Sequence, residues 1–395
     1  MIKDGKDYKG VQKYFCKKCG RYFRETTAYD THGQYWEAAV EYVSEGISVK
    51  RLCREKRISP NKLLKSVEEL ARRADGVVYN ERRKPGILII DDSKVYINGR
   101  QDYFWEFLDY KSRLKTYADA SRGRGWRDVA RGIITYAANF DLKAVFSDGL
   151  TANARALYHL YAPKVVFVHW NRMPSKDFPL KTEHSLIIID DFGDFAVVSL
   201  GRGRKLSLGR FKCRTNLDLA ELILRFSDEL AVIVVNTKRN LSKIAELLLD
   251  DDSGGDYVYH FICGKGYLKA LVERAIRDVK RRVSWFDGRF NSLENSRCFF
   301  KVNAFYYNMF HHHETLGCRP FEACSGKVIR CERDVWITLA VAKRIKVNDF
   351  LNSLKFGQKI GQEILIILIV AISVKIITPP PFWTYRHHIN APVKS

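Results

Sequence analysis

Apolar and polar positions along the chain follow two patterns, which together predict mixed α/β structure. Short β-branched apolar runs predict buried strands, and longer stretches with apolar residues every three or four positions predict helices. The predicted strands are residues 86–90, 103–109, 114–120, 142–146, 165–168, 185–189, 195–200 and 231–235. The predicted helices are residues 127–139, 217–226, 241–249 and 267–284. Strands that alternate with helices favour an α/β fold.

Three shorter helices precede this region and predict a helix-turn-helix domain over residues 31–78. Ser48 and Ser59 are each followed by an apolar helical pattern, and a serine at that place caps a helix. The last helix carries Lys62 and Lys65 beside its apolar stripe, as a helix that enters the major groove would. The alternative is an ordinary three-helix packing unit, and only the charge argues against it.

The charge of the whole chain indicates a polyanionic partner. The 395 residues include 67 Lys and Arg against 45 Asp and Glu, a net charge of +22. Such an excess is typical of proteins that neutralise phosphates, although ribosomal and membrane-surface proteins share it. Aromatic residues make up 13%, which excludes a disordered basic tail.

The start of the chain and its cysteine usage favour a cytoplasmic location. No signal peptide follows Met1, and most of the nine cysteines are scattered, as in a reducing compartment. The apolar run 364–377 is shorter than the roughly 20 residues that a membrane helix needs. We expect a buried strand or an irregular tail there, and no membrane partner.

Cys16 and Cys19 form a C-x-x-C knuckle within residues 1–30. Two such thiolates can bind one metal, but a structural zinc site needs four ligands. No second C-x-x-C exists, and His32 is the only nearby candidate. The pair is either an exposed dithiol on a turn or the second half of a zinc ribbon whose first knuckle lies before Met1.

Carboxylates follow two of the predicted strands. Asp91 and Asp92 end the strand 86–90, and Asp148 ends the strand 142–146. Acids at the ends of neighbouring strands can meet at one sheet edge, as paired metal ions require. A single Asp after a strand is usually only a turn residue, so the pair needs a third acid to become a catalytic hypothesis.

The helix 267–284 supplies that third acid. Glu273 and Lys280 lie seven residues apart and project the same way on a helix of 3.6 residues per turn. A carboxylate for metal and a cation for phosphate on one face suit phosphodiester chemistry. The alternative is a solvated basic helix in which Glu273 pairs with Arg277.

Four blocks of sequence occur in the order found in one known family. They are residues 89–95 with Gly99 and Asp109, residues 144–149, residues 271–282, and residues 305–323 with their Tyr-Asn, His, Leu-Gly and Pro-x-Glu-Ala pattern. With these blocks the chain resembles an insertion-sequence transposase of the DDE superfamily, over roughly residues 1–330. That resemblance implies a ribonuclease H-like catalytic domain with a mixed sheet and flanking helices.

The resemblance also implies the organisation of the chain. A partial zinc ribbon and the helix-turn-helix domain would precede the catalytic core, and an α/β insertion would interrupt it. The predicted segments are 1–30 zinc ribbon, 31–78 helix-turn-helix, 86–170 first part of the core, 171–264 inserted subdomain, 265–330 end of the core and 331–395 unassigned tail.

The implied chemistry is metal-dependent cleavage and transfer of DNA strands. Asp91, Asp148 and Glu273 would bind two Mg²⁺ or Mn²⁺ ions, with Asp92 as the substitute for Asp91. The cations named for DNA or phosphate are Lys280, Arg277, Lys62 and Lys65, and Cys16 and Cys19 are named for zinc. The implied partners are double-stranded DNA, as terminal inverted repeats and target, and a second copy of the chain or more on paired ends. The implied location is the nucleoid of a prokaryotic cell.

Other interpretations remain open at this point. The chain could be an inactive or domesticated DNA-binding remnant, or a ribonuclease H-like nuclease that cuts without joining ends. Residues 186–191 repeat the pattern of the first-aspartate strand. We interpret this as convergent use of an acid in a turn after a strand, although Asp190 stays a minor rival for the first acid. The run of three histidines at 311–313 suits a metal, although a helix end near DNA is the simpler interpretation.

Overall fold

The computed structural model describes most of the first 336 residues. The described ranges are 2–6, 12–15, 17, 22–24, 28–75, 77, 84–170, 185–200, 206–227, 231–249, 257–262, 267–284, 289–331 and 335–336. The chain divides into two bodies, Met1–Arg344 and Ile345–Ser395, and every described residue belongs to the first. The apolar run 364–377 therefore lies outside the described residues. No helix within the described ranges combines the length and apolar character that crossing a bilayer requires.

Three short strands form a separate antiparallel sheet at the start of the chain. They are β1 (Ile2–Lys6), β2 (Gln12–Phe15) and β3 (Tyr22–Arg24), in that order. Cys16 and Cys19, with the zinc predicted on them, lie outside the described residues, as does the side chain of His32.

The next three helices are α1 (Ala28–Glu45), α2 (Val49–Lys56) and α3 (Pro60–Ala74). The predicted caps are present, because Ser48 accepts a hydrogen bond from the backbone N–H of Arg51 and Ser59 accepts one from that of Lys62. A tight connection separates α2 from α3, with Arg57 in the left-handed region at φ 54°. Helix α3 packs on α1 and on α9 of the following domain.

The large domain is built on one mixed sheet of 11 strands. Its order is β11-β10-β9-β12-β8-β13-β7-β4-β5-β6, and β14 pairs with β4 outside that path. The strands are β4 (Pro85–Ile97), β5 (Arg100–Asp109), β6 (Lys115–Ser121), β7 (Asp141–Ser147), β8 (Val165–Trp170), β9 (Ser185–Asp191), β10 (Phe195–Leu200), β11 (Leu206–Lys212), β12 (Ala231–Thr237), β13 (Val258–Ile262) and β14 (Arg289–Phe290).

The centre of the sheet is parallel and its two ends are antiparallel. Every neighbouring pair from β9 to β4 along that order is parallel. The hairpins β4-β5-β6 and β9-β10-β11 close the two ends. The central strands are buried on both faces and consist largely of Val, Ile and Phe, as parallel strands covered by helices do. The predicted α/β class is confirmed.

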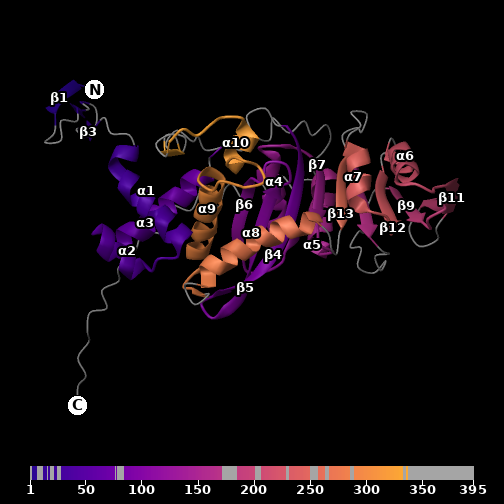
Figure 1. The fold of residues 1–395 in the computed structure, drawn as a ribbon, viewed down its shortest axis with the longest axis horizontal. Coiled ribbons are helices and arrows are strands. Elements are labelled where there is room, and N and C mark those ends of the chain that lie inside the picture. The colour runs from indigo at the N-terminus through magenta and orange to yellow at the C-terminus, as the bar shows by residue number, and fades with distance from the viewer. Residues whose placement is uncertain are drawn as a thin grey trace, which may run out of the picture. The chain divides into compact units, whose positions relative to one another are not determined.

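Helices cover both faces of this sheet. They are α4 (Trp126–Ala137), α5 (Thr151–Tyr161), α6 (Asn216–Ser227), α7 (Leu241–Leu249), α8 (Tyr267–Ser284), α9 (Leu293–Met309) and α10 (Pro320–Ser325). Helix α8 packs on β4, β5 and β7 and crosses in front of β4 and β5 in Figure 1. The five described strands between residues 171 and 264, interpreted above as an inserted subdomain, extend the same sheet.

Alternate residues of β5 identify the two faces. Phe104 stacks on Phe300 of α9 at 4.1 Å between ring centroids, so it faces α8 and α9. Phe107 points the opposite way, and its ring lies directly against Gly132 of α4. A Cβ atom at position 132 would overlap that ring, so the close approach of α4 to the sheet depends on glycine there.

We therefore expect Gly132→Ala to lower the free energy of unfolding by about 1–3 kcal/mol, because overpacking forces a buried ring or the helix to move. Urea unfolding followed by circular dichroism measures this. Gly123→Ala is the matched control, because a Cβ atom there has nothing within 4 Å. Equal stability of the two variants would contradict this account of the packing.

Candidate functional site

Three carboxylates meet where β7 ends beside β4. One carboxylate oxygen from each of Asp91, Asp92 and Asp148 lies within 4.8 Å of the others, and all three residues are half-buried. Among the described residues, these three acids form the group whose side chains are close enough together to bind one metal ion. The structure thus brings together the first two acids predicted from the sequence and the substitute Asp92.

The pairing of the strands explains how the acids meet. Strands β4 and β7 are parallel, with Ile89 opposite Phe146, and each strand reaches its acid two residues later. On β5, Glu106 lies opposite Asp91, and opposite residues of an antiparallel pair share a face of the sheet. Asp91 therefore belongs to the face covered by α8, and Asp92 to the face of α4.

Asp148 is held by the residues that begin α5. Its Oδ1 accepts hydrogen bonds of 3.1 Å from the backbone N–H of Leu150 and from the Asn153 side chain. Asn153 is buried on the first turn of α5. These two donors fix the direction of the carboxylate.

The backbone before Asp148 has a second support, from a strand much later in the chain. Ser147 Oγ lies 2.8 Å from Nε2 of His260 on β13 and donates to the carbonyl oxygen of Asp148. Burial lowers the pKa of His260 well below its usual value, so the ring is neutral at neutral pH. The neutral imidazole can therefore form a hydrogen bond with Ser147 without placing a positive charge beside the acids.

Asp92 already has a cationic partner. Arg124, from the loop between β6 and α4, donates from Nε to Asp92 Oδ2 at 2.8 Å and from Nη2 to Oδ1 at 2.5 Å. The Asp92 side chain is only 3% exposed, and the guanidinium lies over the Tyr103 ring. The hydrogen bond to Asp92 raises the pKa of Arg124. One guanidinium therefore engages both oxygens of Asp92. Asp91 Oδ1 accepts a hydrogen bond of 2.9 Å from the backbone N–H of Asp92.

The predicted third acid does not join the cluster. Glu273 lies on α8 with an exposed side chain and is not part of the group of acids described above. The α8 acid that acts on the sheet is Asp278, whose charge raises the pKa of Glu106. Asp278 is half-buried and pairs with Arg281 at 3.0 Å and Arg282 at 3.6 Å.

A buried ion pair lies on the same face as Asp91. Lys115 Nζ is 2.5 Å from Glu106 Oε1, and both side chains are at most 1% exposed. Burial raises the pKa of Glu106, and the charge of Lys115 opposes that effect. Asn308 of α9 bonds to both backbone groups of Lys115 at 2.8 Å. The pair connects β5, β6 and α9 beneath α8.

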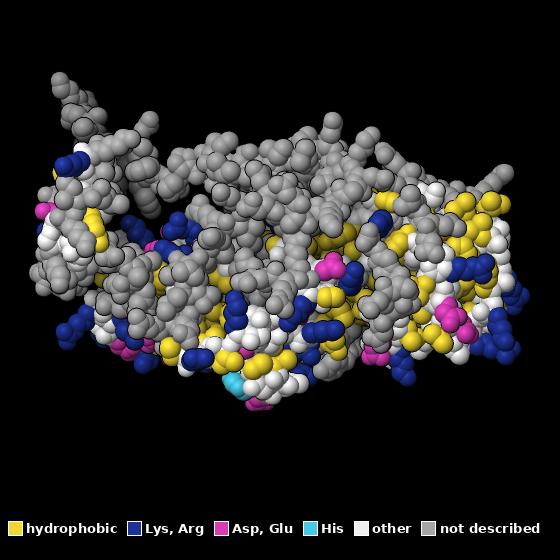
Figure 2. Space-filling model, turned by 90° about the horizontal axis from the view of Figure 1, so that it is seen from above, with side chains coloured by type: hydrophobic (Ala, Val, Ile, Leu, Met, Phe, Trp, Pro, Cys, Tyr) yellow, Lys and Arg dark blue, Asp and Glu magenta, His cyan; other side chains and the backbone are white. Residues whose placement is uncertain are grey.

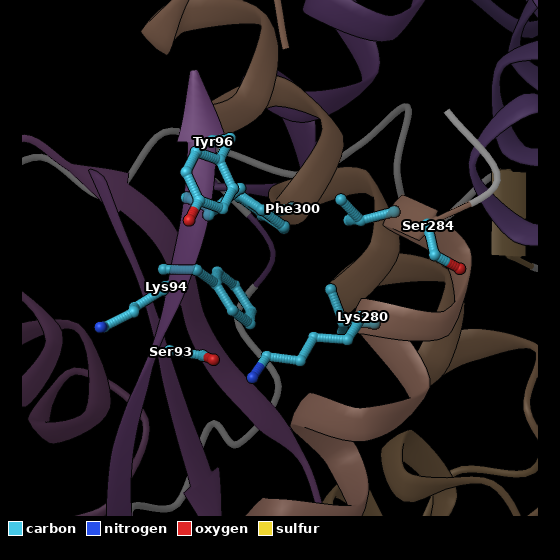
Figure 3. A pocket seen from close by; sticks show the side chains of 10 residues that line it. Ser93, Lys94, Tyr96, Lys280, Ser284 and Phe300 are labelled. Carbon is cyan, nitrogen blue, oxygen red and sulfur yellow. The ribbon is translucent and has the colours of Figure 1, made fainter. Parts of the chain in front are cut away.

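Lys280 lines a pocket that begins next to the acids. The pocket holds about 180 Å³ between the second half of β4 and the last turns of α8. Lys280 extends from α8 toward Ser93, two residues beyond Asp91, and the exposed ring of Tyr96 lies at the opposite side (Figure 3). Lys280, predicted to bind phosphate, therefore lines a pocket next to the acids. Arg277, the other cation predicted on α8, is exposed.

The two cations predicted to bind DNA lie on the outer face of α3. Lys62 and Lys65 are both exposed, with Lys62 Nζ over the Tyr35 ring at 5.6 Å. Lys and Arg side chains occur at several separate places on the face of the molecule in Figure 2. The three histidines at 311–313 follow the end of α9, where His311 stacks on Tyr307 at 5.0 Å, and they join no metal-ligand group of the described residues.

The chain matches no known family profile and no curated protein. Among solved structures it is similar to a ROK family transcriptional regulator, a homologue of the E. coli MLC protein. The TM-score is 0.13 and the identity 10%, over 78% of this chain and 99% of the regulator. A TM-score this low supports no argument about the fold or function of this chain.

The transposase function predicted from the sequence was wrong by these comparisons, and so was the remnant derived from it. No family model, of transposases or of any other proteins, matches the chain. The physical reason lies in the motifs, because an acid directly after a buried strand also serves as an ordinary turn residue. The second such strand, β9, ends on Asp190 and Asp191, whose carboxylates accept hydrogen bonds from Asn236 and Arg239.

Sequence reasoning missed Arg124 and Asn153, which set the state of the acids. Arg124 lies in a Gly-flanked turn after a predicted strand, and Asn153 lies in the first turn of a helix that was not predicted. A polar residue in either position is common in loops. The sequence therefore held no signal that would have selected them.

Because Arg124 competes for the acids, we expect Arg124→Gln to tighten divalent-cation binding. Loss of a half-exposed ion pair of about 1 kcal/mol corresponds to about fivefold in affinity. Isothermal titration with Mn²⁺ measures this, and Arg122→Gln, an exposed arginine of the same loop, is the control. Weaker binding in Arg124→Gln would show that the guanidinium organises the site rather than competing for it.

Proposed function

We propose that this protein hydrolyses phosphodiester bonds in nucleic acid with the help of divalent cations bound by Asp91 and Asp148. The observation that carries the proposal is the meeting of three carboxylates, within 4.8 Å, at the ends of two parallel strands. The reaction is cleavage by water without joining of strands. It requires no protein nucleophile.

The residues of the cluster suit Mg²⁺ or Mn²⁺. Their donors are carboxylate oxygens, which hard divalent cations prefer, and the described histidines and cysteines lie outside the group. Asp91 and Asp148 would hold the cation. Asp92 would lie beside them, paired with Arg124. When bound, the cation supplies a polarised phosphate and a more acidic water.

The surrounding residues provide places for a nucleic-acid strand. Lys280 extends into the pocket beside Asp91 and can neutralise a phosphate next to the one that is cut. The exposed Tyr96 at the rim offers a surface for a base. Arg124 is within reach of the same carboxylates and can turn to the substrate when a cation replaces it.

The order of the first strands supports a ribonuclease H-like interpretation of this part of the sheet. An antiparallel β4-β5-β6 hairpin unit is followed by the parallel strand β7, with acids on β4 and after β7. The acid expected from α8 is not in the cluster, so the proposal rests on Asp91 and Asp148 and gives Glu273 no role.

Double-stranded DNA is the partner that the helical domain favours. Lys62 and Lys65 are exposed on α3, the second helix of a helix-turn-helix pair, and the chain carries a net charge of +22. Phosphate neutralisation by such residues supplies most of non-specific DNA affinity. The N-terminal domain would then bring the acids to their substrate.

We expect Asp148→Asn to reduce cleavage of a labelled oligonucleotide in Mg²⁺ or Mn²⁺ by at least about 100-fold, since it removes a ligand rather than an outer contact. Asp141→Asn is the matched control, because it makes the same change at the opposite end of the same strand. Asp141 is 55% exposed and pairs with the nearby Lys143. The assay measures initial rates on single- and double-stranded substrates.

Retained cleavage in Asp148→Asn would overturn the proposed function. Equal losses in Asp148→Asn and Asp141→Asn would point to damage of the strand rather than of the site. Joined products in the same assay would show strand transfer, which the proposal does not include.

For the helical domain, we expect the double substitution Lys62→Gln with Lys65→Gln to weaken DNA binding and its salt dependence. The slope of log K against log[salt] falls by about 0.9 for each phosphate that is no longer neutralised. Fluorescence anisotropy over a salt series measures this. Lys238→Gln with Lys243→Gln is the control, since these lysines are exposed near α7. An unchanged slope would remove α3 from the DNA-binding surface.

A further inference from the structure

The sequence of elements in the large domain occurs twice. The first run, residues 85–170 or the first half, is β4, β5, β6, α4, β7, α5 and β8. The second run, residues 185–262 or the second half, is β9, β10, β11, α6, β12, α7 and β13. Each half is three strands, a helix, a strand, a helix and a strand.

The pairing within the two halves is also the same. In each, the first three strands form antiparallel hairpins and the fourth strand adds in parallel to the first, as β7 does to β4 and β12 to β9. In each, the two helices pack on one another, α4 on α5 and α6 on α7. The matching helices α4 and α6 have 12 residues each, and the matching strands β7 and β12 have 7 each.

Only the last strands depart from a simple repeat, and they do so reciprocally. Strand β13, the last of the second half, pairs with β7 of the first, while β8, the last of the first half, pairs with β12 of the second. The two last strands pair with each other in parallel at the junction. The order read from either end of the sheet is therefore third, second, first, fourth, and then the last strand of the other half.

We infer that the two halves are copies of one ancestral unit that have exchanged their last strands, and that the second half holds a closed counterpart of the acid site. The first strands support this directly. Residues 87–92 read Ile-Leu-Ile-Ile-Asp-Asp and residues 186–191 read Leu-Ile-Ile-Ile-Asp-Asp. Asp190 and Asp191 are thus the counterparts of Asp91 and Asp92.

The register identifies the counterpart of Asp148. In the first half Ile89 lies opposite Phe146, which places Asp148 beside Asp91. In the second half Asp190 lies directly opposite Asn236. An amide therefore stands where the first half has its third carboxylate, and its Nδ2 donates to Asp190 Oδ1 at 2.8 Å.

Arg239 completes the closure of the second site. Its Nε donates to Asp191 Oδ2 at 2.8 Å, and Nη2 bonds to the carbonyl oxygens of Gly193 at 2.6 Å and Cys213 at 2.7 Å. The side chains of Asp191 and Arg239 are 2% and 13% exposed. The guanidinium thereby joins the ends of β9 and β11, and Asp191 is paired with Arg239 as Asp92 is with Arg124 in the first half. The two sites differ at the third position, where Asn236 replaces Asp148.

Reopening the second site tests this inference. In an Asp148→Asn background, which disables the first site, we expect Asn236→Asp with Arg239→Gln to restore one Mn²⁺ site, because the change recreates three acids without the internal cation. Electron paramagnetic resonance counts the bound Mn²⁺, and Asp148→Asn alone is the control. A restored site supports the inference, and a folded variant that gains no Mn²⁺ overturns it if the wild type binds Mn²⁺.

Thermal melting provides a measurement that does not depend on metal binding. We expect Asp191→Asn to lower the melting temperature by several degrees, since it breaks a buried ion pair. Asp92→Asn is the matched variant of the first half and should lower the melting temperature by a similar amount, because Asp92 forms the corresponding ion pair with Arg124. A fall in only one of the two variants would overturn the assignment of Asp191 as the counterpart of Asp92.

The two measurements also separate this inference from the proposed function. A wild-type protein that binds no Mn²⁺ counts against the nuclease, and the inference is then decided by the comparison of Asp191→Asn with Asp92→Asn. Loss of nuclease activity in Asp148→Asn, in turn, says nothing about the second half.

Discussion

The parallel pairing of β4 with β7 is the interaction on which the candidate site depends. It sets where two acids that are 57 positions apart in the chain, Asp91 and Asp148, lie along the strands. A register shift of one residue would turn a strand's side chains to the other face of the sheet. Repulsion among three carboxylates opposes this arrangement. Arg124 offsets it from one side, and hydrogen bonds from the start of α5 offset it from the other.

The buried pair of Glu106 and Lys115 is a second constraint on the same region. Two charges without solvent are costly to bury, and removal of one partner leaves the other unpaired. Glu106 lies opposite Asp91 in register, and Asn308 of α9 fixes the backbone of Lys115. Lys115 therefore already balances the charge of Glu106, so the three acids, and not Glu106, would bind a metal ion at Asp91.

Most strands and helices of the sheet could be predicted, because their apolar periodicity is regular. Strand β4 was predicted to end at residue 90 and instead continues to Ile97, since its second half alternates polar and apolar residues and pairs with β5. Strand β13 was missed because five residues with a central His260 give too little pattern. Of the site, Asp91 and Asp148 were predicted from their positions after strands. Glu273 was predicted from the helical face that it shares with Lys280 and from the family resemblance, and it lies outside the cluster.

The exchange of last strands is what sequence patterns could not reveal, and it changes how the site is supported. A strand next to β7 is needed to hold Asp148, and the following strand in the chain, β8, would ordinarily provide it. Here β13 takes that place and brings His260 to within 2.8 Å of Ser147. The acid site of the first half is thus complete only when the second half is present, so the two halves depend on each other, although only the first has a third carboxylate.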